Sequence, residues 1–202
     1  MLKVLNLYAG VGGNRKLWDG VEVVAVENDP KIAAVYQKLY PEDEVFVDDA
    51  HDFLLDAHEF FDFVWSSPPC QSHSRMVKAG RNRKPRYPEM DLYQEIIFLQ
   101  HFFKGGWVVE NVKPYYKELI PPTKVIGRHW FWSNFEIEAE DVPRPSNFIN
   151  STVKDGLMDW LDIHYEEKLY YGNNHCLGQV LRNCVHPHIG RDILQSFAQV
   201  SE

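Results

Sequence analysis

The fold is decided by the stretch "LKVLNLYAGVGGN", residues 2–14, in which a short apolar run leads into three glycines. A leucine- and valine-rich run of this length indicates a buried β-strand. Glycines allow the backbone to turn tightly and to approach a ligand closely. We therefore expect a strand, a ligand-binding loop, and a helix that opens at Asn14. Because glycine turns after strands are also common structural features, the loop alone does not identify a ligand.

The following residues repeat this alternation. Short apolar runs predict strands at residues 21–27, 44–49, 61–67 and 105–112. Apolar residues at helical spacing predict helices at 28–40, 49–60 and 89–103. Strands that alternate with helices predict a mostly parallel sheet in an α/β fold. Residues 128–140 predict an antiparallel pair near the sheet edge, and residues 188–200 predict a last helix.

The pattern divides the chain into three expected parts. Residues 1–140 form the main domain. Residues 141–178 are loop-rich, and we interpret them as a small lobe. Residues 179–202 form a C-terminal segment.

Composition limits the class of protein. The chain has 202 residues, of which 45% are hydrophobic, enough to build a core. It shows no secretory leader and no apolar segment long enough to span a membrane, so we predict a cytoplasmic protein. The three cysteines are irregularly spaced, which argues against a disulfide framework and leaves room for a reactive thiol.

The charge is unevenly distributed. The net charge is -8, yet residues 75–86 carry six basic residues and no acidic one. This run predicts a local anion-binding loop on an acidic body, as a nucleic-acid ligand would need. The alternative is a solvated charge run without a ligand.

Acidic residues follow the second and third predicted strands. Glu27 lies where a carboxylate can accept hydrogen bonds from the ribose hydroxyls of an adenosine-type ligand. Asp49 can accept from an adenine amino group, or Asp48 and Asp49 can cap the next helix. The glycines do not have the spacing of a dinucleotide-binding loop, which favours a shorter ligand, with S-adenosylmethionine the leading candidate.

Cys70 follows the fourth predicted strand directly after Pro68 and Pro69. The prolines fix φ and remove two backbone donors, so the thiol lies on a stiff segment, as a nucleophile requires. The alternative is a small buried core residue, but the polar residues after Cys70 are not a core sequence. Glu110, at the end of the fifth strand, can give a proton to a ring nitrogen or cap a turn. Arg128 can brace a phosphate, a base or Glu110.

Taken in order, these motifs resemble those of the cytosine-5 DNA methyltransferase family. The resemblance is carried by "LYAGVGG" (7–13), "VEND" (26–29), "VDDA" (47–50), "SSPPCQS" (66–72), "ENV" (110–112) and "LRNCVHP" (181–187). It implies a Rossmann-like S-adenosylmethionine-dependent methyltransferase that flips a cytosine out of double-stranded DNA and attacks it with Cys70. It also implies that residues 141–178 are a short target-recognition lobe and that the segment around Asn183 packs beside the glycine loop.

With the strand-end positions, the resemblance gives the expected site. The catalytic residues are Cys70, Glu110 and Arg128. The cofactor-binding residues are Tyr8, Ala9, Gly10, Gly12, Gly13, Glu27, Asn28, Asp49, Ala50, Pro68, Asn183 and Val185. The DNA-binding residues are Gln71, Ser72, Ser74, Arg75, Lys78, Arg81, Arg83 and Lys84.

Two positions depart from the family pattern. The family has two arginines one residue apart where this chain has Arg128, His129 and Trp130, and it has a glycine where this chain has Arg182. The first departure puts the role of Arg128 in doubt, and the second can reshape the cofactor edge. The short lobe predicts a short or loosely read recognition sequence, or help from a partner.

Two alternative functions stay open at this stage. The substrate can be tRNA, since a tRNA-modifying relative shares these motifs, or the chain can be a catalytically silent DNA-binding relative. The sequence also leaves open a restriction endonuclease partner, as in a restriction-modification system, and the oligomeric state. A zinc site from His175, Cys176, His186 and His188 would fit no standard spacing, so we predict no metal.

Overall fold

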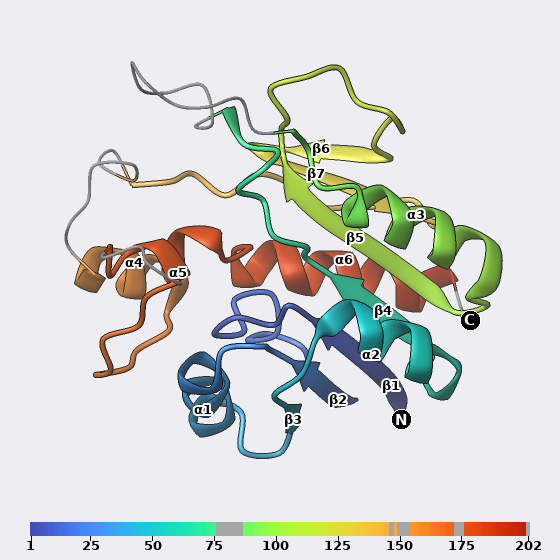
Figure 1. Ribbon diagram of the computed structural model, residues 1–202. Helices are drawn as coiled ribbons and strands as arrows, with labels where there is room; N and C mark the ends of the chain where they lie inside the picture. The colour runs from blue at the N-terminus through green and yellow to red at the C-terminus, as the bar shows by residue number, and fades with distance from the viewer. Residues whose placement is uncertain (76–86, 146–147, 149–153, 172–175, 201–202) are drawn as a thin grey trace.

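The computed structural model describes residues 1–75, 87–145, 148, 154–171 and 176–200. They form an α/β fold around one seven-stranded sheet with the strand order β3-β2-β1-β4-β5-β7-β6 (Figure 1). The strands are β1 Leu2–Leu7, β2 Val21–Val26, β3 Glu44–Phe46, β4 Phe63–Ser66, β5 Gly106–Val112, β6 Lys124–Ile126 and β7 His129–Ser133. Strands β1 to β5 are parallel, and β7 pairs antiparallel with β5 and β6. The predicted fold class, Rossmann-like α/β with a mostly parallel sheet, is confirmed.

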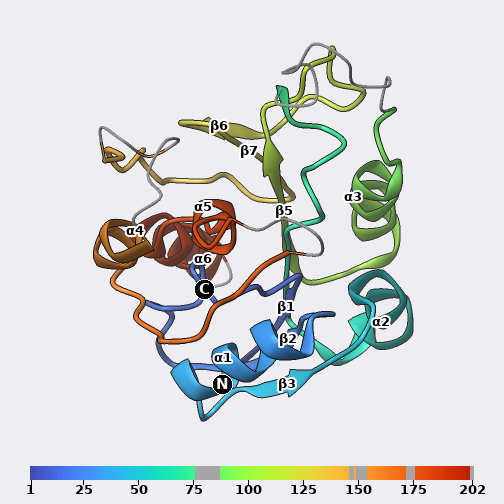
Figure 2. The same cartoon turned by 60° about the vertical axis from the view of Figure 1, so that its left-hand side comes forward.

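Helices cover both faces of this sheet. They are α1 Pro30–Leu39, α2 Ala50–Ala57, α3 Asp91–Phe102, α4 Lys154–Leu161, α5 Gln179–Asn183 and α6 Pro187–Val200. Figure 2 shows α2 and α3 on one face, with α6, α5 and α4 on the other. The predicted helices at 28–40, 49–60, 89–103 and 188–200 are present. None of the helices in the described ranges is long and apolar enough to cross a membrane.

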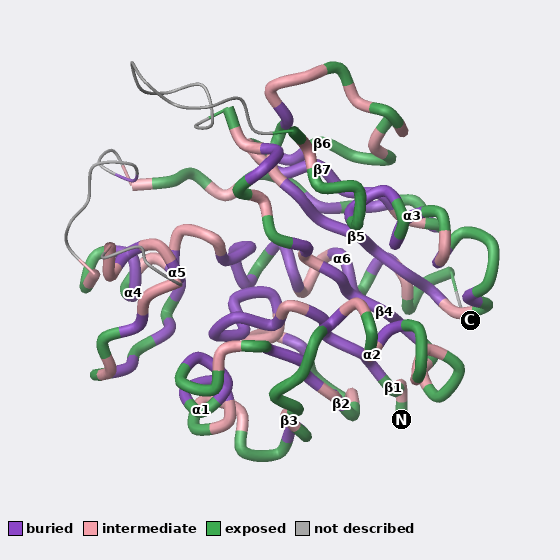
Figure 3. The backbone as a smooth tube through the Cα atoms, viewed as in Figure 1, coloured by how far each residue is buried: buried purple, intermediate pink, exposed green. Residues whose placement is uncertain are grey.

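Alternating side chains of the strands build two cores. Val4 and Trp65 face α6, whereas Leu5 and Val64 face α2 and α3. All four side chains are fully buried, and Figure 3 shows β4 and β5 buried along almost their whole length. A strand that is apolar on both sides is what a sheet with helices on both faces requires.

The strand order creates the place for a ligand. From β1 the chain moves to β2 and β3 on one side, and it then returns to β4 and β5 on the other. The loops that follow β1 and β4 therefore leave the sheet in opposite directions at its carboxyl edge. In open α/β sheets such a switch point is where ligands bind.

The expected helix at Asn14 is wrong. Residues 11–17 form successive turns, in which Arg15 N donates to Gly12 O and Trp18 N donates to Arg15 O. Asn14 does not cap a helix, because its Nδ2 donates to Oδ1 of the buried Asn6 at 2.9 Å. The connection from β1 to β2 is thus a compact loop.

The expected antiparallel pair within residues 128–140 is also wrong in its bounds. The hairpin is formed by β6 and β7, and residues 136–140 form no strand. The alternation continues past β7 because Phe135, Ile137 and Ala139 are buried in the cluster that includes α6. In this segment, apolar residues at every second position indicate an extended chain that packs on the core, not a strand that pairs with a neighbour.

The late segment packs beside the glycine loop, as the resemblance implied. A Cβ at Gly13 would lie 2.6 Å from the Cβ of Cys184, and one at Gly190 would lie 2.2 Å from the carbonyl oxygen of Asn14. Described residues of 148–171, among them Leu157 and Leu161, pack in the same cluster as Val11 of this loop. The boundaries drawn at 140 and 178 stay a prediction.

The close approach at Gly190 gives a stability prediction. In Gly190→Ala the added methyl group must push α6 away from the loop backbone. We therefore expect the free energy of unfolding to fall by about 1–3 kcal/mol. Gly156→Ala is the control, since no atom lies within 4 Å of its Cβ position in α4 and alanine favours helix. Urea denaturation measures both variants. Equal midpoints for Gly190→Ala and the parent protein would contradict the packing.

Candidate active site

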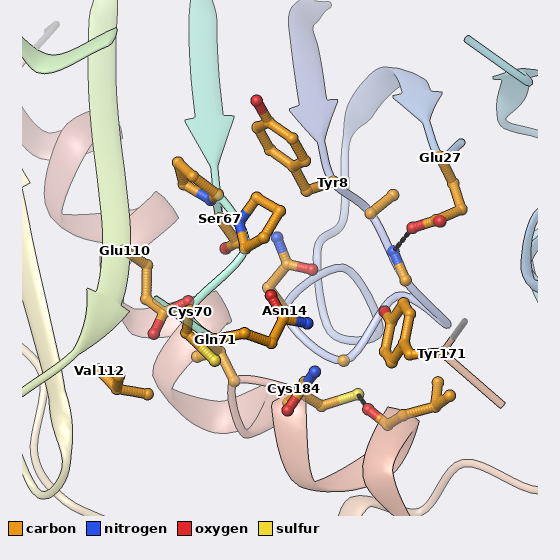
Figure 4. Close-up of a pocket in the computed structure, with 18 of the residues that line it drawn as sticks. Tyr8, Asn14, Glu27, Ser67, Cys70, Gln71, Glu110, Val112, Tyr171 and Cys184 are labelled. Atoms are coloured by element: carbon orange, nitrogen blue, oxygen red, sulfur yellow. Dashed lines mark hydrogen bonds between the residues drawn. The ribbon is translucent and has the colours of Figure 1, made fainter. Parts of the chain in front are cut away.

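One cavity of about 600 Å³ lies at the carboxyl edge of β1, β4 and β5. It brings together most of the predicted site residues: Tyr8, Ala9, Gly10, Gly13, Glu27, Asn28, Pro68, Cys70, Gln71, Glu110, Arg128, Asn183 and Val185. Figure 4 shows Cys70 and Glu110 at one side of the cavity and Glu27 at the other. The predicted residues Gly12, Asp49 and Ala50 do not line it.

Glu27 fixes the glycine loop on the cofactor side. It is 4% exposed, and its two carboxylate oxygens accept from the backbone N–H groups of Gly10 and Asp29, each at 3.0 Å. Burial raises the pKa of Glu27, while these two hydrogen bonds oppose the rise. A carboxylate has about four acceptor positions, so these bonds leave acceptor capacity for a ligand.

Tyr8 lines both this cavity and a neighbouring hollow. Its φ is 54°, a left-handed conformation that is uncommon for a large side chain. Its hydroxyl donates to the fully buried Glu95 at 2.6 Å, and Ser66 Oγ donates to the same carboxylate. Burial and Glu95 raise the pKa of Tyr8, so the phenol stays protonated and holds this bond.

Asp49 lies in the neighbouring hollow, which measures about 290 Å³. Its Oδ1 accepts from His51 N at 2.9 Å and Asp52 N at 3.1 Å, so it is the N-cap of α2. The helix-cap alternative therefore describes this carboxylate in the structure. Adenine recognition by Asp49 stays a prediction, as do the cofactor roles of Ala50 and Gly12.

The segment that carries Cys70 is held at both ends. Asn111 on β5 donates from Nδ2 to the Pro68 carbonyl oxygen at 3.0 Å. Beyond the thiol, the carbonyl oxygen of Cys70 accepts from the N–H groups of His73 and Ser74. These bonds add to the restriction of the two prolines. The backbone on both sides of Cys70 is therefore restricted. Figure 4 shows the Cys70 side chain pointing into the cavity.

The thiol is not activated in the free protein. Burial raises the pKa of Cys70 to about 11, with the Glu110 carboxylate adding to the rise and Arg128 opposing it. Cys176 differs, because a hydrogen bond from Arg182 lowers its pKa. The surroundings of Cys70 in the free protein thus favour the thiol over the thiolate.

This difference predicts the order of alkylation by iodoacetamide. The rise from 9.0 to about 11 lowers the thiolate fraction of Cys70 about 100-fold at neutral pH, and the greater nucleophilicity of a basic thiolate recovers about 10-fold. Cys176 should therefore be labelled first, with Cys70 labelling increasing as the pH is raised towards 11. Peptide mass spectrometry distinguishes the two, and Cys176→Ser is the control. Faster labelling of Cys70 at neutral pH would contradict the burial argument.

Glu110 and Arg128 are connected through His129. Glu110 is 5% exposed, and its Oε1 lies 2.5 Å from His129 Nδ1. Arg128 Nε donates to His129 Nε2 at 3.0 Å, and another guanidinium nitrogen donates to the carbonyl oxygen of Arg182. Burial lowers the pKa of Arg128, while the Glu110 carboxylate opposes this. The three side chains form one hydrogen-bonded chain along the cavity wall.

The predicted DNA-binding residues are only partly described. Gln71 and Arg75 are exposed, whereas Ser72 is 2% exposed and its Oγ accepts from Glu89 N. Ser74 forms a bridge with Pro114. The remaining four, Lys78, Arg81, Arg83 and Lys84, lie outside the described residues. The DNA contacts therefore all stay predictions.

Several residues of the cavity were missed by the sequence analysis. They include Asn14, Tyr171 and Cys184. Asn14 follows the glycine cluster, which was a usable signal, but Tyr171 comes from an irregular segment with no pattern to mark it. Of the zinc alternative, His175 lies outside the described residues. His186 Nε2 lies 3.0 Å from the Trp160 carbonyl oxygen, and its Nδ1 accepts from His188 N.

The sheet order and the cavity at its switch point define a Rossmann-like α/β protein with a site for a small ligand beside a cysteine and a carboxylate. The family model of C-5 cytosine-specific DNA methylases matches residues 2–118, more than half of the chain. The chain belongs to this family. The match contains Cys70 and Glu110, while Arg128 and Asn183 lie beyond it.

Solved structures give more distant similarities. DNMT2 of Spodoptera frugiperda is 26% identical over 56% of this chain and 36% of its own, with a TM-score of 0.42. A hypothetical protein of Thermus thermophilus is 20% identical over 69% of this chain and 75% of its own, with a TM-score of 0.45. A SAM-dependent methyltransferase of Agrobacterium tumefaciens is 18% identical over 57% of this chain and 40% of its own, with a TM-score of 0.41. The matched part thus spans about a third of the DNMT2 chain. No curated protein is significantly similar in sequence.

Proposed function

We propose that this protein transfers a methyl group from S-adenosylmethionine to carbon 5 of a flipped-out cytosine in double-stranded DNA, through a covalent Cys70 adduct. The observation that carries the proposal is the meeting of Cys70, Glu110 and Arg128 with the glycine loop and Glu27 around one cavity. Membership in the C-5 cytosine-specific DNA methylase family supports the reaction type. The substrate, the cofactor and the adduct are our inference.

The residues of the cavity fit S-adenosylmethionine. Glu27 offers a buried carboxylate with acceptor capacity for ribose hydroxyls. At Gly10 the nearest atom to a Cβ position is the Tyr171 hydroxyl at 3.5 Å, which leaves room for a ligand to approach the backbone closely. Tyr8, Asn28, Asn183 and Val185 also line the cavity. When bound there, the cofactor would supply an electrophilic methyl group.

The cysteine explains how an unreactive carbon becomes a nucleophile. Carbon 5 of cytosine is too weak to take a methyl group unaided. Addition of the Cys70 thiolate to carbon 6 converts the ring into an enamine whose electron density lies at carbon 5. After methylation, loss of the carbon 5 proton expels the thiolate and restores the aromatic ring.

The neighbours of Cys70 manage the charge that this addition creates. Glu110 would hold a proton at the ring nitrogen N3, and Arg128 would stabilise the carbonyl oxygen. Since the ring atoms are stacked inside a duplex, the base must first leave the helix at a cost of a few kcal/mol. Residues 72–86 would hold the phosphates around the vacated position, and residues 141–178 would read the target sequence.

Tritium transfer from labelled S-adenosylmethionine tests the proposal. The protein is incubated with duplex DNA, with tRNA, and with neither, and each reaction is repeated with Cys70→Ala. Incorporation into duplex DNA that depends on Cys70 supports the proposal. Incorporation into tRNA alone would overturn the DNA assignment, and incorporation into neither would favour the silent DNA-binding relative.

The cellular setting is proposed on the same basis. A DNA-modifying enzyme of this class would act in the cytoplasm on accessible DNA. Bisulfite sequencing of DNA from expressing cells can locate the methylated sequence. A restriction endonuclease partner would be one that cuts this sequence when it is unmethylated and leaves it intact when it is methylated.

A further inference from the structure

His129 occupies the place between the two charged groups of the cavity. It is 8% exposed, and its ring contacts Glu110 Oε1 through Nδ1 and Arg128 Nε through Nε2. It also lines the cavity itself. In this segment Arg128 is followed by His129 and Trp130, and it is the imidazole that connects the guanidinium group of Arg128 to the carboxyl group of Glu110.

The hydrogen bonds fix the proton on the imidazole. An arginine side chain can only donate, so Nε2 of His129 must accept from Arg128 and carries no hydrogen. The neutral ring therefore has its hydrogen on Nδ1, where it faces Glu110 Oε1. An imidazolium would place two donors against each other at Nε2, which the contact with Arg128 disfavours.

The same bonds fix the carboxyl group of Glu110. Because Oε1 already accepts from His129, a proton on this carboxyl group belongs on Oε2. The figure shows the Glu110 carboxyl group directed towards Cys70 in the cavity (Figure 4). The chain from Arg128 through His129 thus orients the one proton that a bound base could receive.

We propose that His129 is a positioning residue that holds Glu110 with its acidic proton on Oε2, and that Arg128 acts on Glu110 through this imidazole. This inference rests on the proposed function, since it assigns a task within the same reaction. It differs from a packing role. The ring of His129 does stack on Phe131, with centroids 6.2 Å apart, so the test must separate the hydrogen bond from the stacking.

Two substitutions separate them. His129→Asn keeps a side-chain N–H near the position of Nδ1 but loses the ring, whereas His129→Phe keeps a stacked ring and loses the donor. A positioned general acid contributes about 100- to 10,000-fold, so we expect His129→Phe to lower the single-turnover rate of methyl transfer roughly 10-fold or more. We expect His129→Asn to retain more activity than His129→Phe. Cofactor KM should change little in either, because Glu27 lies at the other end of the cavity.

The opposite order, with His129→Phe more active than His129→Asn, would overturn the proposal in favour of packing. A second measurement does not depend on activity. In nitrogen-15 NMR of the intact wild-type protein, with the His129 signals assigned by their loss in His129→Asn, we expect a hydrogen on Nδ1 and none on Nε2. A hydrogen on Nε2 at neutral pH would overturn the proposal. Absence of methyl transfer by the wild type would instead overturn the proposed function, and the tautomer would still be read.

Discussion

Replacing Cys70 by alanine should reduce methyl transfer by about 10⁴-fold or more, the largest effect that we expect for any single substitution. The reason is chemical, since without addition at carbon 6 the ring offers no enamine and carbon 5 stays unreactive. The other side chains of the proposed cofactor and cytosine sites are unchanged in this variant. A rate measured by tritium transfer in single turnover should therefore collapse, while cofactor binding by calorimetry should persist.

A covalent trap makes the same prediction more specific. An oligonucleotide with 5-fluorocytosine at the target cannot lose a proton from carbon 5, so the wild-type protein should remain crosslinked to it. Cys70→Ala should form no such complex. Cys176→Ser is the matched control, since this thiol does not line the cavity, and it should crosslink like the wild type. A crosslink in Cys70→Ala, or none in the wild type, would refute the role of this sulfur.

The sequence predicted the residues at the carboxyl ends of the parallel strands well. The spacing of apolar residues marks each strand, and the polar residues that follow mark its end, so both can be recognised from neighbouring residues. A run such as residues 2–7 is apolar on both sides only if helices cover both faces. Parallel strands then bring their carboxyl ends to one edge, so Glu27, Cys70 and Glu110 meet without any further information. Their meeting in one cavity follows from topology alone.

The sequence failed where long-range packing decides the conformation. The alternation of Phe135, Ile137 and Ala139 is the pattern of a strand, yet these residues pack with α6 instead. Tyr171 reaches the cavity from a segment without periodicity, and its hydroxyl lies 3.5 Å from the Cβ position of Gly10. Neither placement can be read from neighbours in sequence, since the partner is contributed by a distant segment.

His129 illustrates an intermediate case. The sequence analysis named it only as the residue after Arg128, in a segment that departs from the family pattern, and the register of β5 and β7 shows where its side chain lies. Glu110 pairs with Phe131, so the side chains of positions 129 and 131 lie on the same face as Glu110. The pairing of two strands thus brings an imidazole into contact with Glu110, a contact that the sequence analysis did not predict.

Substituting Glu110 by glutamine is expected to lower the methyl-transfer rate about 10²- to 10⁴-fold, the contribution of a positioned general acid. Glutamine has nearly the same shape, and its oxygen can still accept from His129 Nδ1 while its amide group faces the cavity. The fold and the hydrogen-bonded chain to Arg128 should therefore survive. What is lost is a proton that can move to N3 as Cys70 adds to the ring.

The experiment compares Glu110→Gln with Glu118→Gln, a half-buried glutamate on the segment after β5 that does not line the cavity. Single-turnover tritium transfer should fall only in Glu110→Gln, and cofactor affinity should be unchanged in both because Glu27 is untouched. Crosslinking to 5-fluorocytosine should be slowed rather than abolished, since Cys70 remains and only the stabilisation of its addition is missing. If Glu110→Gln transferred methyl groups within about tenfold of the wild type, N3 would not take its proton from this residue, and the chain through His129 would have no chemical purpose.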